Sequence, residues 1–329
     1  MSTVAVASDP AADPLRGYAP VHVDMLKRVA RAPVDIFVQR DRRSVPTLYC
    51  RAGLPMENNQ LLGLADAGIK DVYVRNGDFQ DFGLCLMESV QAQLGSDDIS
   101  PADQFAALQL AVAVEIERTS RLIDCSKYVS LSEKVGRDLT ALIASNDVMP
   151  RDLFKIARHD FNTFTHVTNV ASYSVVLAER LGITSTNELE QIATASMLHD
   201  IGKRFIPASI LNKPTRLDPD ERDVIESHPT RGYEDLCERS DLNYGQLMIV
   251  YQHHERVDGN GYPVGVPAAD IHPWAKIVSV VDVFDAMTGK RPYRKSINPV
   301  EALQFIERNA GTHFDPEMAK CWISAMKKA

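Results

Sequence analysis

The second half of the chain is a succession of segments whose apolar residues recur at helical spacing. In the segment 160–182, Val167 and Val170 fall on one face, and Gly182 ends the pattern. This spacing predicts an all-helical bundle over 150–329. Further segments with this spacing occur at 187–203, 220–236, 244–263 and 275–289, and two more helices begin near 298 and 316.

The first half has a different pattern. Segments 34–39, 47–52 and 70–76 have strand composition, and 57–69 between them has helical spacing. Residues 100–123 and 130–145 are again typical of helices, and NDVMP at 146–150 breaks the pattern. We therefore expect an α+β chain whose all-α domain follows a small α/β module. The expected parts are a disordered tail at 1–16, the α/β module at 17–98, a helical connector at 99–149 and the helical domain at 150–329.

Two segments leave alternatives open. The β-branched run 275–289 has the composition of a strand, although its apolar spacing favours a helix. The apolar stripe along 100–123 is typical of ordinary core packing, but it also suits a dimer seam or a signal-bearing connector.

Composition excludes several classes of protein. The net charge of −8 argues against binding to a nucleic-acid polymer, which needs a basic field. The five cysteines form no CxxC pair, which argues against a disulfide framework or a thiolate zinc site. No apolar run approaches the roughly 18 residues that span a bilayer, and the N-terminus lacks signal-peptide features. We expect a cytoplasmic protein without membrane insertion.

Eight of the nine histidines lie after residue 150. A single histidine beside an apolar face is usually a satisfied core residue, but five segments that each offer a potential ligand are harder to explain that way. Burying so many imidazoles and carboxylates without a cation would leave polar groups unpaired. Nitrogen and oxygen ligands without a thiolate suit iron, manganese, nickel or zinc. The candidates are His166, His199 with Asp200, His228, His253 with His254, and Asp282.

Two adjacent pairs in this set suggest two metal ions. His199 and Asp200 can each reach one ion, or the Asp200 carboxylate can bridge both. His253 and His254 differ by about 100° around a helix, so we expect them to reach different ions. Two metals roughly 4 Å apart suit displacement at phosphorus, because they form hydroxide from water and neutralise phosphoryl charge.

Four blocks in the order found here resemble the HD-GYP domain family over about 150–329: HDIGK (199–203), HHERVDGNGYP (253–263), DVFDAMTGKRPYR (282–294) and GTHFDPEM (311–318). The resemblance implies an all-helical HD-type fold and hydrolysis of cyclic di-GMP to pGpG, sometimes onward to GMP. It also implies two divalent metal ions, with iron or manganese favoured. The metal ligands that it implies are His166, His199, Asp200, His228, His253, His254 and Asp282.

The resemblance assigns further roles. Asp200 would bridge the metals, and Lys203 would face a substrate phosphate, which makes these two the catalytic candidates. On this basis a metal-bridging hydroxide attacks phosphorus and expels the 3′-oxygen. The substrate-binding residues that the resemblance implies are Lys203, Gly261, Tyr262, Pro263, Arg291 and Arg294.

One position departs from part of the family. Some members carry an acidic ligand one turn before the residue matching His166, which supports a third metal. This chain has Asn162 there, a weak neutral ligand. We therefore expect two metals and a product that stops at pGpG.

The sequence leaves two other functions open. One is a cyclic di-GMP sensor that signals through partner proteins without useful catalysis, and the other is a hydrolase of another cyclic dinucleotide. The α/β module at 17–98 carries no recognisable catalytic motif and lacks the phosphoacceptor pattern of a receiver. We expect it to regulate the catalytic half or to mediate a homodimer through the connector.

Overall fold

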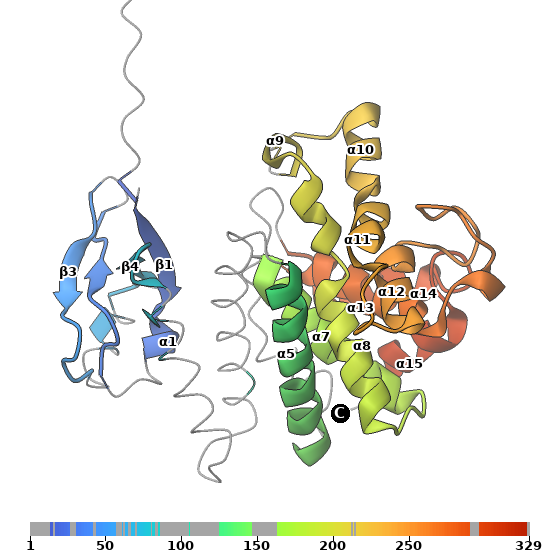
Figure 1. Cartoon of the computed structure of the whole chain (residues 1–329), viewed down its shortest axis with the longest axis horizontal. Helices are drawn as coiled ribbons and strands as arrows, with labels where there is room; N and C mark the ends of the chain where they lie inside the picture. The colour runs from blue at the N-terminus through green and yellow to red at the C-terminus, as the bar shows by residue number, and fades with distance from the viewer. Residues whose placement is uncertain are drawn as a thin grey trace, which may run out of the picture. The chain divides into compact units, whose positions relative to one another are not determined.

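The computed structural model describes residues 14–26, 31–82, 125–146, 163–289 and 296–327, apart from short gaps within these ranges, together with Cys85 and Phe105. The chain divides into two compact units, Met1–Gly95 and Ser96–Ala329 (Figure 1). Each unit is described by itself.

The first unit contains a four-stranded antiparallel sheet in the order β1-β4-β2-β3. Three of its strands lie where strand composition predicted them. The strand β1 was missed because Pro20 lies inside it, and proline is tolerated there because β1 is at an edge of the sheet. The predicted helix over 57–69 lies largely outside the described residues. The elements are β1 (Tyr18–His22), α1 (Val23–Leu26), β2 (Ile36–Val38), β3 (Thr47–Cys50) and β4 (Asp71–Arg75).

The described part of the second unit is helical, as predicted, and 275–289 forms a helix rather than a strand. The segment 220–236, predicted as one helix, is two, because Pro229 has no N–H to continue the ladder. The elements are α5 (Cys125–Asn146), α7 (Thr163–Arg180), α8 (Thr186–Leu198), η1 (Ile201–Phe205), α9 (Ala208–Leu211), α10 (Pro219–Glu226), α11 (His228–Leu236), α12 (Tyr244–Gln252), η2 (Ala268–Asp270), α13 (Pro273–Thr288), α14 (Pro299–Arg308) and α15 (Pro316–Lys327).

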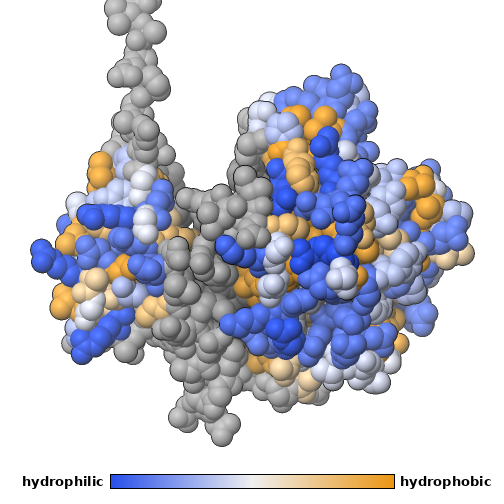
Figure 2. All heavy atoms as spheres, viewed as in Figure 1, coloured by the Kyte–Doolittle hydropathy of each residue, from blue (hydrophilic) through white to orange (hydrophobic). Residues whose placement is uncertain are grey.

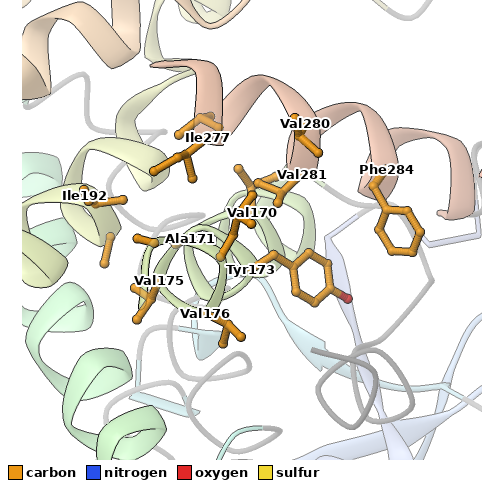
Figure 3. Close-up of a cluster of buried hydrophobic side chains, with 14 of the residues drawn as sticks. Val170, Ala171, Tyr173, Val175, Val176, Ile192, Ile277, Val280, Val281 and Phe284 are labelled. Atoms are coloured by element: carbon orange, nitrogen blue, oxygen red, sulfur yellow. The ribbon is translucent and has the colours of Figure 1, made fainter. Parts of the chain in front are cut away.

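Helix α7 lies at the centre of the hydrophobic core, with α8 and α13 packed against it (Figure 3). Val170 and Tyr173 are fully buried, and so are Val175 and Val176 on another side of the helix. A helix buried on several sides must be apolar nearly all round, which explains its valine-rich sequence. This central helix carries His166 in its first turn, so the core fixes the position of that imidazole.

Local signals define the ends of the helices. Ser185 caps α8 by accepting a hydrogen bond from the Glu188 N–H, and Asn243 and Gln246 form a reciprocal capping box on α12. Gly182 adopts a positive φ of 94° after α7, which confirms it as the residue that ends this helix. Helix α10 has no buried residue, and hydrophilic side chains cover it (Figure 2).

The expected connector is only partly described. Its helix over 100–123 lies outside the described residues except for Phe105, which is buried, and so does the break at 147–150. The helix predicted over 130–145 is part of α5, which packs against α8 within the second unit. Within the described ranges, no helix combines the length and the apolar character needed to cross a membrane.

Candidate metal centre

The structure brings all seven predicted ligands together in two adjoining groups. Within each group, the potential ligand atoms lie within 4.8 Å of one another. All but His254, which is partly exposed, are buried. The first group is His166, His199 and Asp282, and the second group is Asp200, His228, His253 and His254.

The end of α8 places His199 and Asp200. Helix α8 ends at Leu198, His199 keeps helical backbone angles as its C-cap, and Asp200 begins the tighter 3₁₀ turn η1. The side chain of His199 therefore joins the first group, and the side chain of Asp200 joins the second. The adjacent pair thus reaches both groups.

The Asp200 carboxylate lies between the two groups. Its Oδ2 is 3.4 Å from His199 Nε2 and 3.9 Å from His166 Nε2. Its Oδ1 is 3.3 Å from His228 Nε2 and 3.9 Å from His253 Nε2. One carboxylate oxygen therefore faces each group, which is the arrangement a bridging ligand needs.

Four of the histidines use Nδ1 to fix the direction of the ring. His199 and His228 donate from Nδ1 to the carbonyl oxygens of Ser196 and Ile225, at 2.6 and 2.7 Å. His253 Nδ1 likewise lies 3.1 Å from the carbonyls of Ile249 and Val250. A carbonyl oxygen only accepts, so Nδ1 carries the hydrogen and Nε2 keeps its lone pair. The remaining one, His166, donates to the carboxylate of Asp285.

Among the described residues, the Nε2 lone pairs of His199, His228 and His253 lack donors. His199 Nε2 and Asp200 Oδ1 are buried without a hydrogen-bond partner. The Nε2 atoms of His228 and His253 face each other at 3.3 Å, although neither has a hydrogen to donate. Unpaired buried acceptors that converge in this way are costly unless a cation lies among them. The donor set of imidazole nitrogens and carboxylate oxygens therefore fits a divalent metal centre.

The charges of the cluster shift several pKa values. Burial opposes protonation of His166, but its hydrogen bonds to Asp282 and Asp285 outweigh burial and raise the pKa of His166 to about 9. Burial would raise the pKa of Asp200, but Lys203 and His199 hold it well below its usual range. Burial lowers the pKa of His254 to about 3. Without metal, the cluster therefore holds a charged His166 beside ionised carboxylates.

One expectation about the pair His253 and His254 is wrong. Their rings lie 4.1 Å apart between centroids, and both belong to the second group. His253 keeps helical backbone angles as the C-cap of α12, so the two side chains leave the backbone in different directions and their rings still meet at one group. The two rings therefore approach the same group instead of separate ones.

A cavity of about 290 Å³ opens beside the two groups. The polar side chains on it are potential ligands together with Lys203, whose Nζ donates to Asp200 Oδ2 at 2.5 Å. Tyr262 and a set of apolar side chains complete the lining. A charged end next to an apolar wall suits a ligand that joins phosphate to a flat ring. The lining residues are His166, Lys203, Ile225, His228, His254, Tyr262, Asp282, Val283, Ala286 and Met287.

Glu255 holds the loop that carries Tyr262. Its buried carboxylate accepts hydrogen bonds from the backbone N–H groups of Val264, Gly265 and Val266, at 2.8 to 3.3 Å. The Tyr262 N–H in turn donates to the His254 carbonyl at 3.2 Å, and its ring lies 4.7 Å from the His254 ring. The loop therefore presents Tyr262 against the second group.

Of the other residues predicted to bind substrate, the structure describes Gly261 and Pro263. Gly261 lies against the backbone of Glu255, where a Cβ would be 2.6 Å from the Glu255 Cα, so only glycine fits. Pro263 follows Tyr262 in the same loop. Arg291, Arg294 and Asn162 lie outside the described residues.

Sequence reasoning missed three residues of this site: Asp285, Asn169 and Glu255. Asp285 lies three residues after Asp282 on α13, and Asn169 lies three residues after His166 on α7. A polar residue one turn from a predicted ligand, on the same buried face, was the available signal. Glu255 follows the histidine pair directly, but its partners are backbone groups, which no side-chain pattern indicates.

Comparison with protein families gives one match that covers more than half of the chain. A sequence model of the HD domain family matches residues 143–318. Among solved structures, a protein of Bdellovibrio bacteriovorus described as HD-GYP-like aligns with a TM-score of 0.72 and 18% identity, covering 94% of this chain and 100% of that one. At that identity the likeness concerns the fold.

Curated relatives match about half to two thirds of the chain. A cyclic di-GMP phosphodiesterase of Pseudomonas aeruginosa is 31% identical over 68% of this chain and 50% of its own. A cyclic di-GMP phosphodiesterase response regulator of Xanthomonas campestris is 38% identical over 53% of this chain and 48% of its own. A 3′3′-cGAMP-specific phosphodiesterase of Vibrio cholerae is 35% identical, and the match covers 51% of this chain and 35% of the relative's own length. The chain thus spans half or less of the length of these relatives.

Proposed function

The chain belongs to the HD domain family, and on that premise we propose that it is a metal-dependent phosphodiesterase that hydrolyses cyclic di-GMP to pGpG. The observation that carries the proposal is the placement of Asp200 between two groups of ligands, beside a cavity that Lys203 and Tyr262 line. The names of the curated relatives support the reaction and the substrate.

The seven side chains would hold two divalent ions, with His166, His199 and Asp282 around one and the second group around the other. Asp200 would contribute one carboxylate oxygen to each. Divalent ions bound there supply a water of lowered pKa and neutralise charge on the phosphoryl group. Iron and manganese suit these nitrogen and oxygen donors.

The remaining residues would bind and orient the nucleotide. Lys203 Nζ lies at the cavity with about a third of its side chain exposed, so it can donate to a phosphate oxygen. The Tyr262 ring and the apolar side chains of Val283 and Met287 can contact a guanine base. Hydrolysis breaks one P–O3′ bond, with water supplying OH to phosphorus and a proton to O3′. Arg291 and Arg294 remain proposed phosphate or guanine contacts.

The experiment is a hydrolysis assay on protein purified anaerobically and loaded with Mn²⁺ or Fe²⁺, with products separated by chromatography. We expect pGpG as the product, and we expect Asp200→Asn and His199→Ala to remove turnover while the far-UV circular dichroism stays close to wild type. Ser240→Ala, an exposed change in the same unit, is the control. Tight binding of cyclic di-GMP without hydrolysis would instead indicate a sensor.

A second substrate has specific support, because some relatives of comparable identity are named 3′3′-cGAMP-specific phosphodiesterases. Both nucleotides present a guanine and two phosphodiesters to the same cavity. A panel of cyclic di-GMP, 3′3′-cGAMP and cyclic di-AMP, compared by kcat/KM, separates these alternatives. Preference for 3′3′-cGAMP would replace cyclic di-GMP in the proposal and leave the metal chemistry unchanged.

We further propose that two metals bind and that the reaction stops at pGpG, because Asn162 replaces an acidic ligand. GMP as the main product would contradict this.

For the first unit we propose that it regulates the helical unit or forms a homodimer, and that signalling partners bind the protein. Light scattering of the full chain, with and without cyclic di-GMP, tests the homodimer.

A further inference from the structure

Behind His166 lies a buried hydrogen-bonded chain of three side chains. His166 Nδ1 lies 2.8 Å from Asp285 Oδ2, and Asn169 Nδ2 donates to Asp285 Oδ1 at 2.8 Å. All three residues are at most 3% exposed. Asp285 belongs to neither ligand group and does not line the cavity. It therefore touches the centre only through the imidazole.

The direction of these hydrogen bonds fixes which nitrogen of His166 keeps its hydrogen, and therefore which nitrogen can bind a metal. An ionised carboxylate only accepts, so the hydrogen of the shared bond lies on His166 Nδ1. The Nε2 atom then faces the centre, 3.1 Å from Asp282 Oδ1 and 3.9 Å from Asp200 Oδ2. Asn169 keeps the Asp285 carboxylate from rotating away, since it holds the second oxygen.

His166 differs in this respect from the other oriented histidines. His199, His228 and His253 donate from Nδ1 to neutral backbone carbonyls. A negatively charged acceptor draws the Nδ1 hydrogen more strongly and makes Nε2 a better donor to a metal. The first group has three potential ligands and the second has four. The group with fewer ligands is thus the one in which a histidine donates to a carboxylate instead of to a carbonyl.

We propose that Asp285 is a positioning residue of the metal centre. It holds His166 in the Nδ1–H tautomer and raises the affinity of the His166, His199 and Asp282 group for its cation, and Asn169 orients it. This inference rests on the proposed function only as far as the metal centre, because it does not depend on the nucleotide that is hydrolysed.

The test variant is Asp285→Asn in the full chain. Its amide has one oxygen and one NH₂ group, but both neighbours, His166 and Asn169, donate toward it. One donor must then face the NH₂ group, and His166 either loses its partner or takes the wrong tautomer. We expect the affinity for Mn²⁺, measured by competition with a chelator in the absence of nucleotide, to fall about 10- to 100-fold.

A double variant supplies the rescue. In Asp285→Asn with Asn169→Asp, the new carboxylate on α7 accepts from the new amide on α13, and the oxygen of that amide then faces His166 Nδ1–H again. We expect this variant to recover at least half of the lost affinity on a logarithmic scale. The matched control is Ser172→Ala on the same helix as His166, which loses a buried hydrogen bond to the Thr168 carbonyl. Its Mn²⁺ affinity should equal that of wild type.

Two results would overturn the proposal. One is a folded Asp285→Asn variant with wild-type Mn²⁺ affinity, and the other is a double variant that binds no better than the single one. If Asp285→Asn does not fold, Asn169→Leu replaces it, with an expected loss of about threefold or more, and unchanged affinity overturns the proposal. Wild-type protein that binds no Mn²⁺ would overturn the metal centre itself, whereas Mn²⁺ binding without hydrolysis would contradict the phosphodiesterase alone.

Discussion

At the scale of single residues, Lys203 pairs with Asp200 and also lines the cavity. Its ammonium group donates to Asp200 Oδ2, and the same group lines the cavity where a phosphate would bind. Cations on Asp200 would neutralise its partner and leave Lys203 available for the substrate. Lys203 is therefore expected to contribute to nucleotide binding more than to metal binding.

The variant Lys203→Met tests this expectation. Loss of a charged hydrogen bond to phosphate costs about 1.5–3 kcal/mol, so kcat/KM should fall roughly 10- to 150-fold while the metal content stays at the wild-type level. The neighbouring cation Arg204 pairs with Asp235 away from the cavity, so Arg204→Met should change kcat/KM less than twofold. Equal losses in the two variants would contradict the role of Lys203.

Residue chemistry explains which parts of the site could be predicted. His166, His199 and Asp282 were predictable because ligating side chains on apolar helical faces are unusual and need a partner. Asp285 could not be predicted, because a sequence does not distinguish an aspartate that hydrogen-bonds to a metal-binding histidine from an aspartate on the surface. The grouping of His253 with His254 was also beyond reach, since it depends on how the two side chains converge in space.

At the scale of elements, the contact between η1 and α11 brings His228 next to Asp200 within the second group. A Cβ on Gly202 would lie 1.9 Å from the His228 carbonyl oxygen and 2.7 Å from the Gly232 nitrogen. Only glycine allows the backbone after Asp200 to lie directly on the helix that carries His228. The glycine of the HDIGK block is thus explained by packing as well as by the turn.

The substitution Gly202→Ala should therefore separate these elements. We expect it to lower the free energy of unfolding by about 3 kcal/mol or more, because backbone atoms cannot move aside as a side chain can. Urea unfolding followed by far-UV circular dichroism measures this, with Ser240→Ala as the exposed control within about 0.5 kcal/mol of wild type. A free energy of unfolding equal to that of wild type in Gly202→Ala would show that η1 and α11 can move apart without loss of stability.

The loop after α12 depends on the hydrogen bonds that the Glu255 carboxylate accepts from its backbone. In Glu255→Gln the amide NH₂ faces backbone N–H donors, so the loop should lose about 1–3 kcal/mol of local stability. We expect kcat/KM to fall roughly tenfold through Tyr262, with the metal content retained. Arg256, which pairs with Asp258 on the surface, gives the control variant Arg256→Gln, for which little change is expected. Metal loss in Glu255→Gln would indicate a wider role.

Most helices could be predicted from apolar spacing, because buried faces in a bundle repeat with the helical period. The exceptions have local causes. The strand β1 contains Pro20, and the break between α10 and α11 follows from Pro229, which removes a hydrogen bond that spacing does not report. The segment 244–263 is helical only over Tyr244–Gln252, and more than half of it is turn and loop. The carboxylate of Glu255 holds the end of that loop through backbone N–H groups, which apolar spacing does not report.

At the scale of the whole molecule, the buried charges predict how the stability of the metal-free protein varies with pH. The pKa of His166 rises from 6.5 to about 9 on folding, so its contribution is complete below pH 6.5 and is lost as the pH rises through 9. The pKa of His254 falls from 6.5 to about 3, so its contribution to the free energy of unfolding is complete above pH 6.5 and is lost as the pH falls toward 3. The sum of the His166 and His254 contributions is therefore greatest near pH 6.5.

Urea unfolding in the presence of a chelator, at intervals between pH 4 and pH 10, measures this profile. We expect a maximum near pH 6.5 and an alkaline decline on the order of 3 kcal/mol. The variant His166→Gln should keep the acid limb and lose the alkaline one. An alkaline decline of equal size in that variant would assign the effect to other groups.

The distance along the chain between the parts of the centre has a consequence for biosynthesis. His166 contacts Asp285, which follows it by 119 residues, and the ligands between them come from separate helices. A ribosome must therefore release α13 before the first group can close around a cation. A polypeptide that stops short of α13 has only part of the first group, so a fully loaded centre marks a chain whose synthesis has passed that helix.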